Sequence, residues 1–167
     1  MVKKLKYLFL SLVPSLIFYS CKPGSLHCSF DACATVAPVS EIQNVQDYVN
    51  NHSLVAFQHC SGLFYRIENA GSGATPSACS NIGITYNTYF FNGTPLEQQT
   101  SPIGISLGGT IRAWRISMPL IKAGGRIVFY VPPSLAYGAQ DVRDQNGNIV
   151  IPANSYLVFE VNLVSVQ

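Results

Sequence analysis

One early segment of the chain repeats its apolar positions with the period of an α-helix. If residues 41–51 form a helix, their apolar side chains lie on one face. These residues are Ile42, Val45, Tyr48 and Val49. Ser40 precedes this segment as a candidate N-cap, and the polar residues 50–52 end it. The pattern predicts an N-terminal helix within residues 41–55.

From His59 onward the pattern changes to short β-forming runs separated by turn residues. The runs that we expect to form strands are residues 62–68, 82–91, 103–107, 126–131 and 156–164. In the second run, alternate residues from Ile82 to Thr88 share one face, as on a half-buried strand. Asn92-Gly93 then follows as a tight-turn dipeptide.

A second, shorter helix is predicted between these strands. Ile111, Trp114 and Met118 mark one helical face. Pro119 limits the length of the helix, and Gly124 begins a clean break in the chain. Several antiparallel strands and one short buried helix indicate an α+β fold, in which a curved antiparallel β-sheet wraps around the helix.

The N-terminus has the pattern of an export signal. Basic residues open the chain, and an uncharged apolar core follows over residues 7–19, too short for a comfortable membrane span. Ser20 then precedes Cys21, which resembles a bacterial lipobox, where the cysteine is acylated and the chain is cleaved just before it. We expect a signal peptide over residues 1–20 and lipidation of Cys21. Because residues 17–19 are bulky for a lipobox, cleavage elsewhere, simple secretion or an uncleaved anchor remain alternatives.

The residues after the signal suit a tether. Residues 21–40 lack long apolar runs and contain Pro23, Gly24 and Pro38. A lipid on Cys21 would hold the protein to a membrane of the cell envelope, facing the periplasm or the cell surface, without a spanning helix.

The charge of the chain belongs largely to the signal. Residues 1–20 hold three of the ten Lys and Arg, so seven basic residues stand against eight acidic ones in the remainder. A remainder so close to neutral gives no sign of nucleic-acid binding. It is long enough for one domain with one core.

Five cysteines are ordinary for an exported protein of this size. If Cys21 carries lipid, four remain, and they allow three pairings; these disulfide candidates are Cys28, Cys33, Cys60 and Cys79. We expect a Cys60–Cys79 bridge, since each of the two precedes a strand-like run, and a Cys28–Cys33 bridge that closes a small loop.

Classical catalytic and metal-binding machinery is not evident in the sequence. The histidines, His27, His52 and His59, precede the strand-rich region. A metal site built from Cys28, Cys33 and Cys60 with His27 or His59 is a weak alternative because no Cys-x-x-Cys pair is present, so we predict no metal. The second half lacks a Gly-x-Ser-x-Gly elbow, a phosphate-binding loop and a His-Glu-x-x-His pair.

Aromatic and aliphatic residues beside turns stand out instead. They are Tyr86, Leu96, Ile111, Trp114, Tyr137, Ile151 and Phe159. A lone tryptophan on a short helix is usually plain core, so the joint occurrence of the set carries the functional interpretation.

Several blocks of the chain resemble one known family. Residues 124–138 look like the central signature of the FKBP-type peptidyl-prolyl isomerases, and residues 151–163 look like that family's closing strand. Further blocks in the family's order are residues 84–86, 92–93, 107–108 and 111–114. The resemblance covers about residues 60–165 and implies an isomerase domain over 56–167. The preceding helix and the cysteine-bearing leader resemble exported lipoprotein members of the Bacteroidota type.

The resemblance implies an apolar cleft between the sheet and the short helix. It makes Trp114 the floor and places four residues in the walls, which are Tyr86, Ile111, Tyr137 and Phe159. Ile151 would offer its backbone N–H to the substrate carbonyl, and Tyr137 its hydroxyl. Leu96 and Glu97 occupy the place of a Phe-Asp pair, and Glu97 would brace the site through its carboxylate. Ile103 and Ile105 replace common phenylalanines, and Ile105 joins Leu96 and Ile111 as a substrate-binding residue.

The resemblance implies cis-trans isomerisation of X-Pro bonds, which assists the folding of exported proteins. Rotation about this bond breaks amide resonance against a barrier of roughly 18–20 kcal/mol. A dry cleft that favours the twisted amide needs no nucleophile, metal or cofactor. The expected partners are proline-containing, unfolded or partly folded exported proteins, and we expect a monomer. The alternative function is a non-catalytic module of the same fold that binds a proline-containing envelope partner.

Overall fold

The structure, a computed structural model, describes residues 28–167. The predicted signal peptide, the lipidation site Cys21 and His27 lie outside the described residues. Within residues 28–167, no helix is long and apolar enough to cross a membrane.

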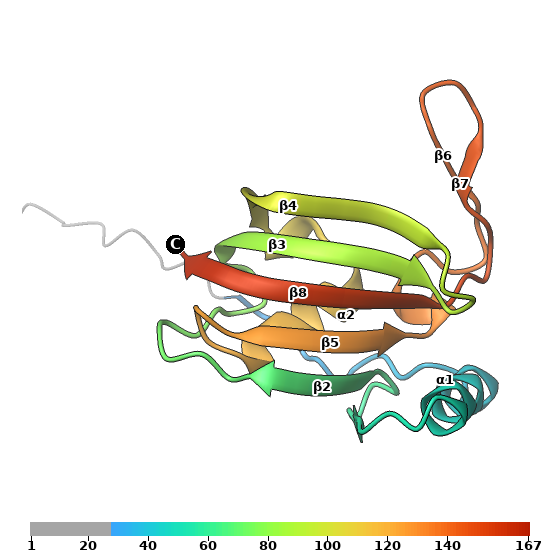
Figure 1. The fold of residues 1–167 in the computed structure, drawn as a ribbon, viewed down its shortest axis with the longest axis horizontal. Coiled ribbons are helices and arrows are strands. Elements are labelled where there is room, and N and C mark those ends of the chain that lie inside the picture. The colour runs from blue at the N-terminus through green and yellow to red at the C-terminus, as the bar shows by residue number, and fades with distance from the viewer. Residues whose placement is uncertain (1–27) are drawn as a thin grey trace, which may run out of the picture.

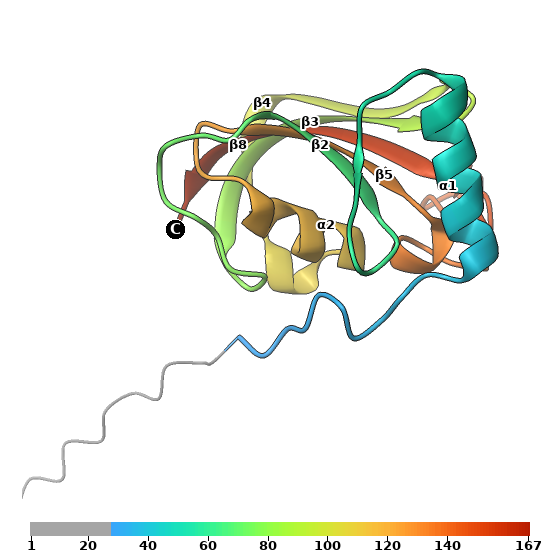
Figure 2. The same ribbon diagram turned by 90° about the horizontal axis from the view of Figure 1, so that it is seen from below.

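Six antiparallel strands form the main sheet, in the spatial order β1-β2-β5-β8-β3-β4. The strands are β1 (Phe57–Gln58), β2 (Phe64–Asn69), β3 (Asn81–Phe90), β4 (Pro95–Ser106), β5 (Arg126–Val131) and β8 (Leu157–Val166). The sheet is curved, and α2 (Arg112–Ser117) lies against its concave side (Figures 1 and 2). The predicted α+β fold is therefore confirmed.

The two faces of the central strands pack against different helices. On β5, Ile127, Phe129 and Val131 join the core around α2, whereas Val128 and Tyr130 join a second cluster on the opposite face. Side chains alternate across a strand, so a strand that is covered on both faces reads as a continuous apolar run. This explains why residues 126–131 contain hardly any polar residue.

The N-terminal helix, α1 (Val39–Asn51), covers the second cluster at one end of the sheet (Figure 2). Val45 and Val49 are buried there, as the helical pattern predicts. The N-cap prediction is wrong: Ser40 lies inside the first turn, and Pro38 holds the N-cap position without a side-chain cap. The backbone oxygen of Pro38 already accepts from the N–H groups of Glu41 and Ile42, both at 3.0 Å, so the helix begins earlier than the capping pattern indicates.

Two regions contain more β-structure than the sequence analysis predicted. The strand expected over 103–107 is the last part of β4, which begins at Pro95. The polar segment 139–150, where no strand was predicted, contains β6 (Val142–Arg143) and most of β7 (Ile149–Ile151), which pair as a separate hairpin. This hairpin projects beyond the sheet (Figure 1).

The four predicted disulfide cysteines are all bonded, but in a different pairing. Cys28 bonds to Cys79 and Cys33 to Cys60, with Cα–Cα distances of 5.8 and 5.5 Å. The expected Cys60–Cys79 and Cys28–Cys33 bridges are wrong. The physical reason is the path of the described segment before α1, residues 28–38, which we call the leader. It runs along the outer side of α2 (Figure 2) and brings each of its cysteines beside a different loop.

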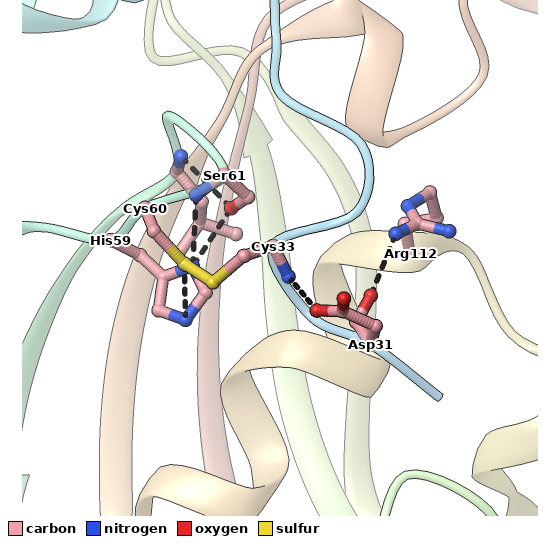
Figure 3. Close-up of a disulfide and its surroundings, with 7 residues drawn as sticks. Asp31, Cys33, His59, Cys60, Ser61 and Arg112 are labelled. Carbon is pink, nitrogen blue, oxygen red and sulfur yellow. Dashed lines mark hydrogen bonds between the residues drawn. A yellow bond between two sulfur atoms is a disulfide. The ribbon is translucent and has the colours of Figure 1, made fainter. Parts of the chain in front are cut away.

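The leader is also packed from Cys28 onward rather than free. Ala37 is buried in the main core, and Phe30 packs against that core under the guanidinium of Arg115, which lies 4.1 Å from the ring centroid. Asp31 accepts a hydrogen bond on its backbone oxygen from Arg112 Nη2 at 3.2 Å (Figure 3). From Cys28 onward, therefore, the segment assigned to a tether belongs to the folded domain.

The surroundings of the Cys33–Cys60 bridge include His59 (Figure 3). The ligand atoms of Cys33, His59 and Cys60 lie within 4.8 Å of one another. Both sulfur atoms are committed to the disulfide, and Ser61 N–H donates to His59 Nδ1 at 3.2 Å. Burial lowers the pKa of His59, which favours the neutral imidazole that this contact requires.

Candidate functional site: an aromatic cleft between the sheet and α2

A cavity of about 300 Å³ opens between the concave face of the sheet and the start of α2. Its lining residues come from β3, β4, β8, α2 with the turn before it, and the loop after β5. They are Ile84, Tyr86, Glu97, Ile105, Gly109, Thr110, Ile111, Trp114, Tyr137 and Phe159. Most are apolar or aromatic, as in clefts that bind small ligands and peptides.

Trp114 is the centre of the aromatic packing. Its ring meets Tyr86 edge-on at 5.3 Å between centroids, and Phe159 at 5.5 Å. Beneath them, Phe129 meets Trp114 edge-on at 5.9 Å and stacks on Phe159 at 5.1 Å. Edge-to-face and offset contacts at these distances are favourable, so the floor of the cleft is rigid and apolar.

The ionisable groups that line the cleft are two tyrosine hydroxyls and one carboxylate. Burial, followed by the neighbouring Glu97 carboxylate, raises the pKa of Tyr86 far above its usual value. The same two causes raise the pKa of Tyr137. Both hydroxyls therefore stay protonated at neutral pH. The Tyr86 hydroxyl faces the Glu97 carboxylate, whereas the Tyr137 hydroxyl can donate a hydrogen bond to a bound carbonyl. None of the described histidines lines this cavity.

Most of the residues proposed from the sequence lie together in this cleft. Those that line it are Tyr86, Glu97, Ile105, Ile111, Trp114, Tyr137 and Phe159. Leu96 does not line it; this side chain is half-buried against the main core. The Ile151 side chain is buried in β7 and does not line it either. The roles assigned to the individual residues stay predictions.

The sequence analysis missed three lining residues, Ile84, Gly109 and Thr110. Ile84 precedes Tyr86 by two positions, so strand alternation already placed both on one face. Thr110 closes the turn before α2, where its Oγ1 donates to the backbone oxygen of Leu107 at 2.8 Å. Only the folded turn shows that Gly109 and Thr110 rim the cavity.

An antiparallel sheet wrapped around one short helix, with an aromatic cleft between them, defines the class to which this protein belongs. Residues 73–164 match the family model described as FKBP-type peptidyl-prolyl cis-trans isomerase. This match covers more than half of the chain. The chain therefore belongs to the family of FKBP-type peptidyl-prolyl cis-trans isomerases.

Relatives of known name agree with this assignment. The FKBP-type isomerase FkpA of Buchnera aphidicola is 36% identical over 109 residues, which cover 64% of this chain and 43% of the relative. The isomerase Mip of Coxiella burnetii is 33% identical over 110 residues, covering 64% and 46%. The chain thus spans less than half the length of these curated relatives.

Solved structures show the same fold. The crystal structure of FkpA from Escherichia coli superposes with a TM-score of 0.65 and 28% identity, covering 77% of this chain and 60% of that one. A peptidyl-prolyl isomerase from Pseudomonas syringae gives the same TM-score at 22% identity, covering 80% and 98%. This second likeness supports the fold alone.

The geometry around Tyr86 makes one prediction about its acidity. Glu97→Gln should lower the pKa of Tyr86, because the anionic phenolate no longer faces a carboxylate. The pKa should stay above the usual tyrosine value, since burial is the larger cause of the shift. Alkaline titration of the protein with ¹³Cζ-labelled tyrosine, followed by NMR, measures this. Tyr48 is the internal control, because burial alone raises its pKa; an unmoved Tyr86 midpoint contradicts the contact.

Proposed function

We propose that this protein catalyses cis-trans isomerisation of X-Pro bonds and thereby assists the folding of exported proteins. The observation that carries the proposal is the cleft itself, an aromatic floor of Trp114 and Phe159 that Phe129 supports from below, with protonated hydroxyl groups at the rim. Family membership supports the same reaction.

The mechanism follows from the electronic change during rotation. A planar amide has a large dipole through resonance, and twisting the C–N bond reduces that charge separation. Transfer from water into the apolar cleft therefore costs the planar amide more than the twisted one, which lowers the barrier. Each 1.4 kcal/mol or so removed gives a factor of ten in rate. Differential binding of the twisted state is sufficient, without a covalent step.

The individual roles in this proposal are those that the family resemblance implies. In this proposal the proline ring lies over Trp114, and the Tyr137 hydroxyl donates to the substrate carbonyl. The backbone N–H of Ile151 is assigned the second carbonyl contact. Glu97 orients Tyr86 through the carboxylate–phenol contact that raises the pKa of Tyr86.

Location in the cell envelope is the second part of the proposal. Two disulfides join the leader to the domain, and such bonds persist in oxidising compartments outside the cytoplasm. The basic and apolar residues 1–20 and the lipobox-like Cys21 add a route of export and a lipid anchor. The proposed clients are exported chains whose proline bonds isomerise slowly.

Two substitutions test where catalysis takes place. Trp114→Leu keeps an apolar floor but loses the shape that holds proline, and should lower kcat/KM at least about tenfold. Tyr137→Phe removes one hydrogen bond to the substrate and should lower it by about threefold to tenfold. A protease-coupled assay on a short X-Pro peptide measures both.

Tyr89→Phe is the matched control, because Tyr89 lies on the same sheet but does not line the cleft. Its activity should equal that of the unchanged protein. Full activity in Trp114→Leu would place catalysis elsewhere, whereas peptide binding without any acceleration would support the non-catalytic binding module.

A further inference from the structure

A second apolar pocket lies between the projecting hairpin and the end of the sheet. Its volume is about 440 Å³. Its lining comes from the β3–β4 turn and from β7 with the residues after it, and consists of Phe90, Asn92, Thr94, Ile149, Val150, Pro152 and Ser155. Two of its apolar residues are unusually open to solvent, with Ile149 48% and Val150 39% exposed.

The hairpin that carries these residues is held by polar contacts at its base and tip. At the base, Asp141 accepts from the backbone N–H of Ala153 at 2.9 Å and pairs with Arg143 at 3.0 Å. At the tip, Asp144 accepts from the backbone N–H groups of Asn146 and Asn148, both at 2.9 Å. The exposed apolar side chains therefore stand on a preformed support, which reduces the entropy cost of binding.

The second pocket continues the face of the sheet that forms the cleft. Tyr86 and Phe90 lie four residues apart on β3 and therefore point to the same side. Both pack against the main core, as does Leu96 of the neighbouring strand between them. At the rise of an extended strand, four residues span about 13 Å. An extended peptide covers the same distance in about four residues.

We propose that this second pocket binds an apolar side chain of the same substrate, about four residues from the proline held in the cleft. The inference rests on the proposed isomerase function and narrows its substrate class. The preferred substrates are extended segments in which a large aliphatic or aromatic residue lies at that spacing. Such segments are exposed in unfolded chains and buried after folding, so the pocket favours unfolded clients.

The lining chemistry supports this occupant. Phe90, Ile149, Val150 and Pro152 offer apolar contact, and no charged residue lines the pocket. The side chains of Asn92, Thr94 and Ser155 can form hydrogen bonds with the backbone of an extended peptide. A charged side chain placed there would lose hydration without an ionic partner, so it should be disfavoured.

The experiment compares substrates of different length and sequence on the purified, oxidised protein. The reference is a short X-Pro tetrapeptide, which cannot reach the second pocket. Longer peptides carry leucine or serine at each position from two to six residues from proline, on either side. Burial of a leucine should raise kcat/KM about fivefold to tenfold over serine. This ratio of kcat/KM for the leucine peptide to kcat/KM for the serine peptide should be largest when the varied residue is about four residues from the proline, on one side of it.

The double variant Ile149→Ser/Val150→Ser should reduce this leucine-to-serine ratio to about one. Val164→Ser is the matched control, since Val164 is 47% exposed on β8 and does not line the pocket. It should keep the full ratio. A ratio near one for the unchanged protein at every spacing, or a full ratio in the double variant, overturns this inference. Failure to accelerate even the tetrapeptide contradicts the proposed function instead.

Discussion

Replacing both cysteines of the Cys28–Cys79 bridge with serine should lower the free energy of unfolding by about 4 kcal/mol. The two cysteines are 51 residues apart, so the bridge removes a large closure entropy from the unfolded chain. The Cys33–Cys60 bridge, with a separation of 27, should contribute slightly less. Loss of the Cys28–Cys79 bridge should also loosen residues 28–32 beside α2, where Phe30 and Asp31 contact Arg115 and Arg112, while Cys33 stays bonded to Cys60.

Equilibrium unfolding in urea measures both effects. The two double-serine variants serve as controls for each other, because each keeps the other bridge. Reduction of the unchanged protein should destabilise it more than either variant. Identical unfolding curves for the oxidised protein and both variants would contradict the conclusion that the two bridges stabilise the domain by fastening the leader to it.

The second large effect is expected from Phe129→Ala. Phe129 is fully buried and supports both Trp114 and Phe159 from below. Truncation leaves a cavity the size of a phenyl ring, which typically costs about 3–5 kcal/mol. Trp114 and Phe159 then lose the surface that fixes them, so isomerase activity should fall although Phe129 does not line the cleft.

Calorimetric unfolding and the peptide assay test this together. Phe57→Ala is the matched control, since Phe57 is 63% exposed on β1 and should change stability by less than about 1 kcal/mol. Phe129→Leu should recover part of the stability. A stable Phe129→Ala variant with unchanged activity would show that the floor of the cleft does not depend on this residue.

The central strands and the short helix were predictable because their patterns are unambiguous. Residues 126–131 form β5 at the predicted bounds, and Trp114 lies in a helix of the predicted position. The start of β4 was not predictable in the same way. Residues 95–102 are largely polar and contain two prolines, which an edge strand tolerates because one side needs no ladder partner.

The disulfide pairing was wrong for a reason that local sequence cannot supply. Cys60 and Cys79 both precede strands, but β2 and β3 are separated by β5 and β8 in the sheet. The leader runs beside α2, where Cys28 bonds to Cys79 in the loop before β3 and Cys33 bonds to Cys60 in the loop before β2. Such a path depends on tertiary packing, and spacing alone leaves all three pairings open.

The aromatic residues that the family resemblance placed in the cleft, Tyr86, Trp114 and Phe159, all line the cavity. The predicted site was incomplete where small residues form the rim, as for Gly109 and Thr110. Leu96, which the family resemblance placed at the cleft, packs against the main core instead. Position along a strand predicts the face of a side chain, but contact with a cavity depends on neighbouring side chains.

Catalysis of X-Pro isomerisation in this cleft can be observed by NMR exchange spectroscopy on a short X-Pro peptide. Alone, the peptide exchanges over tens to hundreds of seconds, too slowly for exchange cross-peaks. A catalytic amount of the oxidised protein should produce cis–trans cross-peaks, which should weaken strongly with Trp114→Leu and remain with Tyr89→Phe. Slow exchange with the unchanged protein, at concentrations where the peptide demonstrably binds, would show that the cleft does not catalyse X-Pro isomerisation.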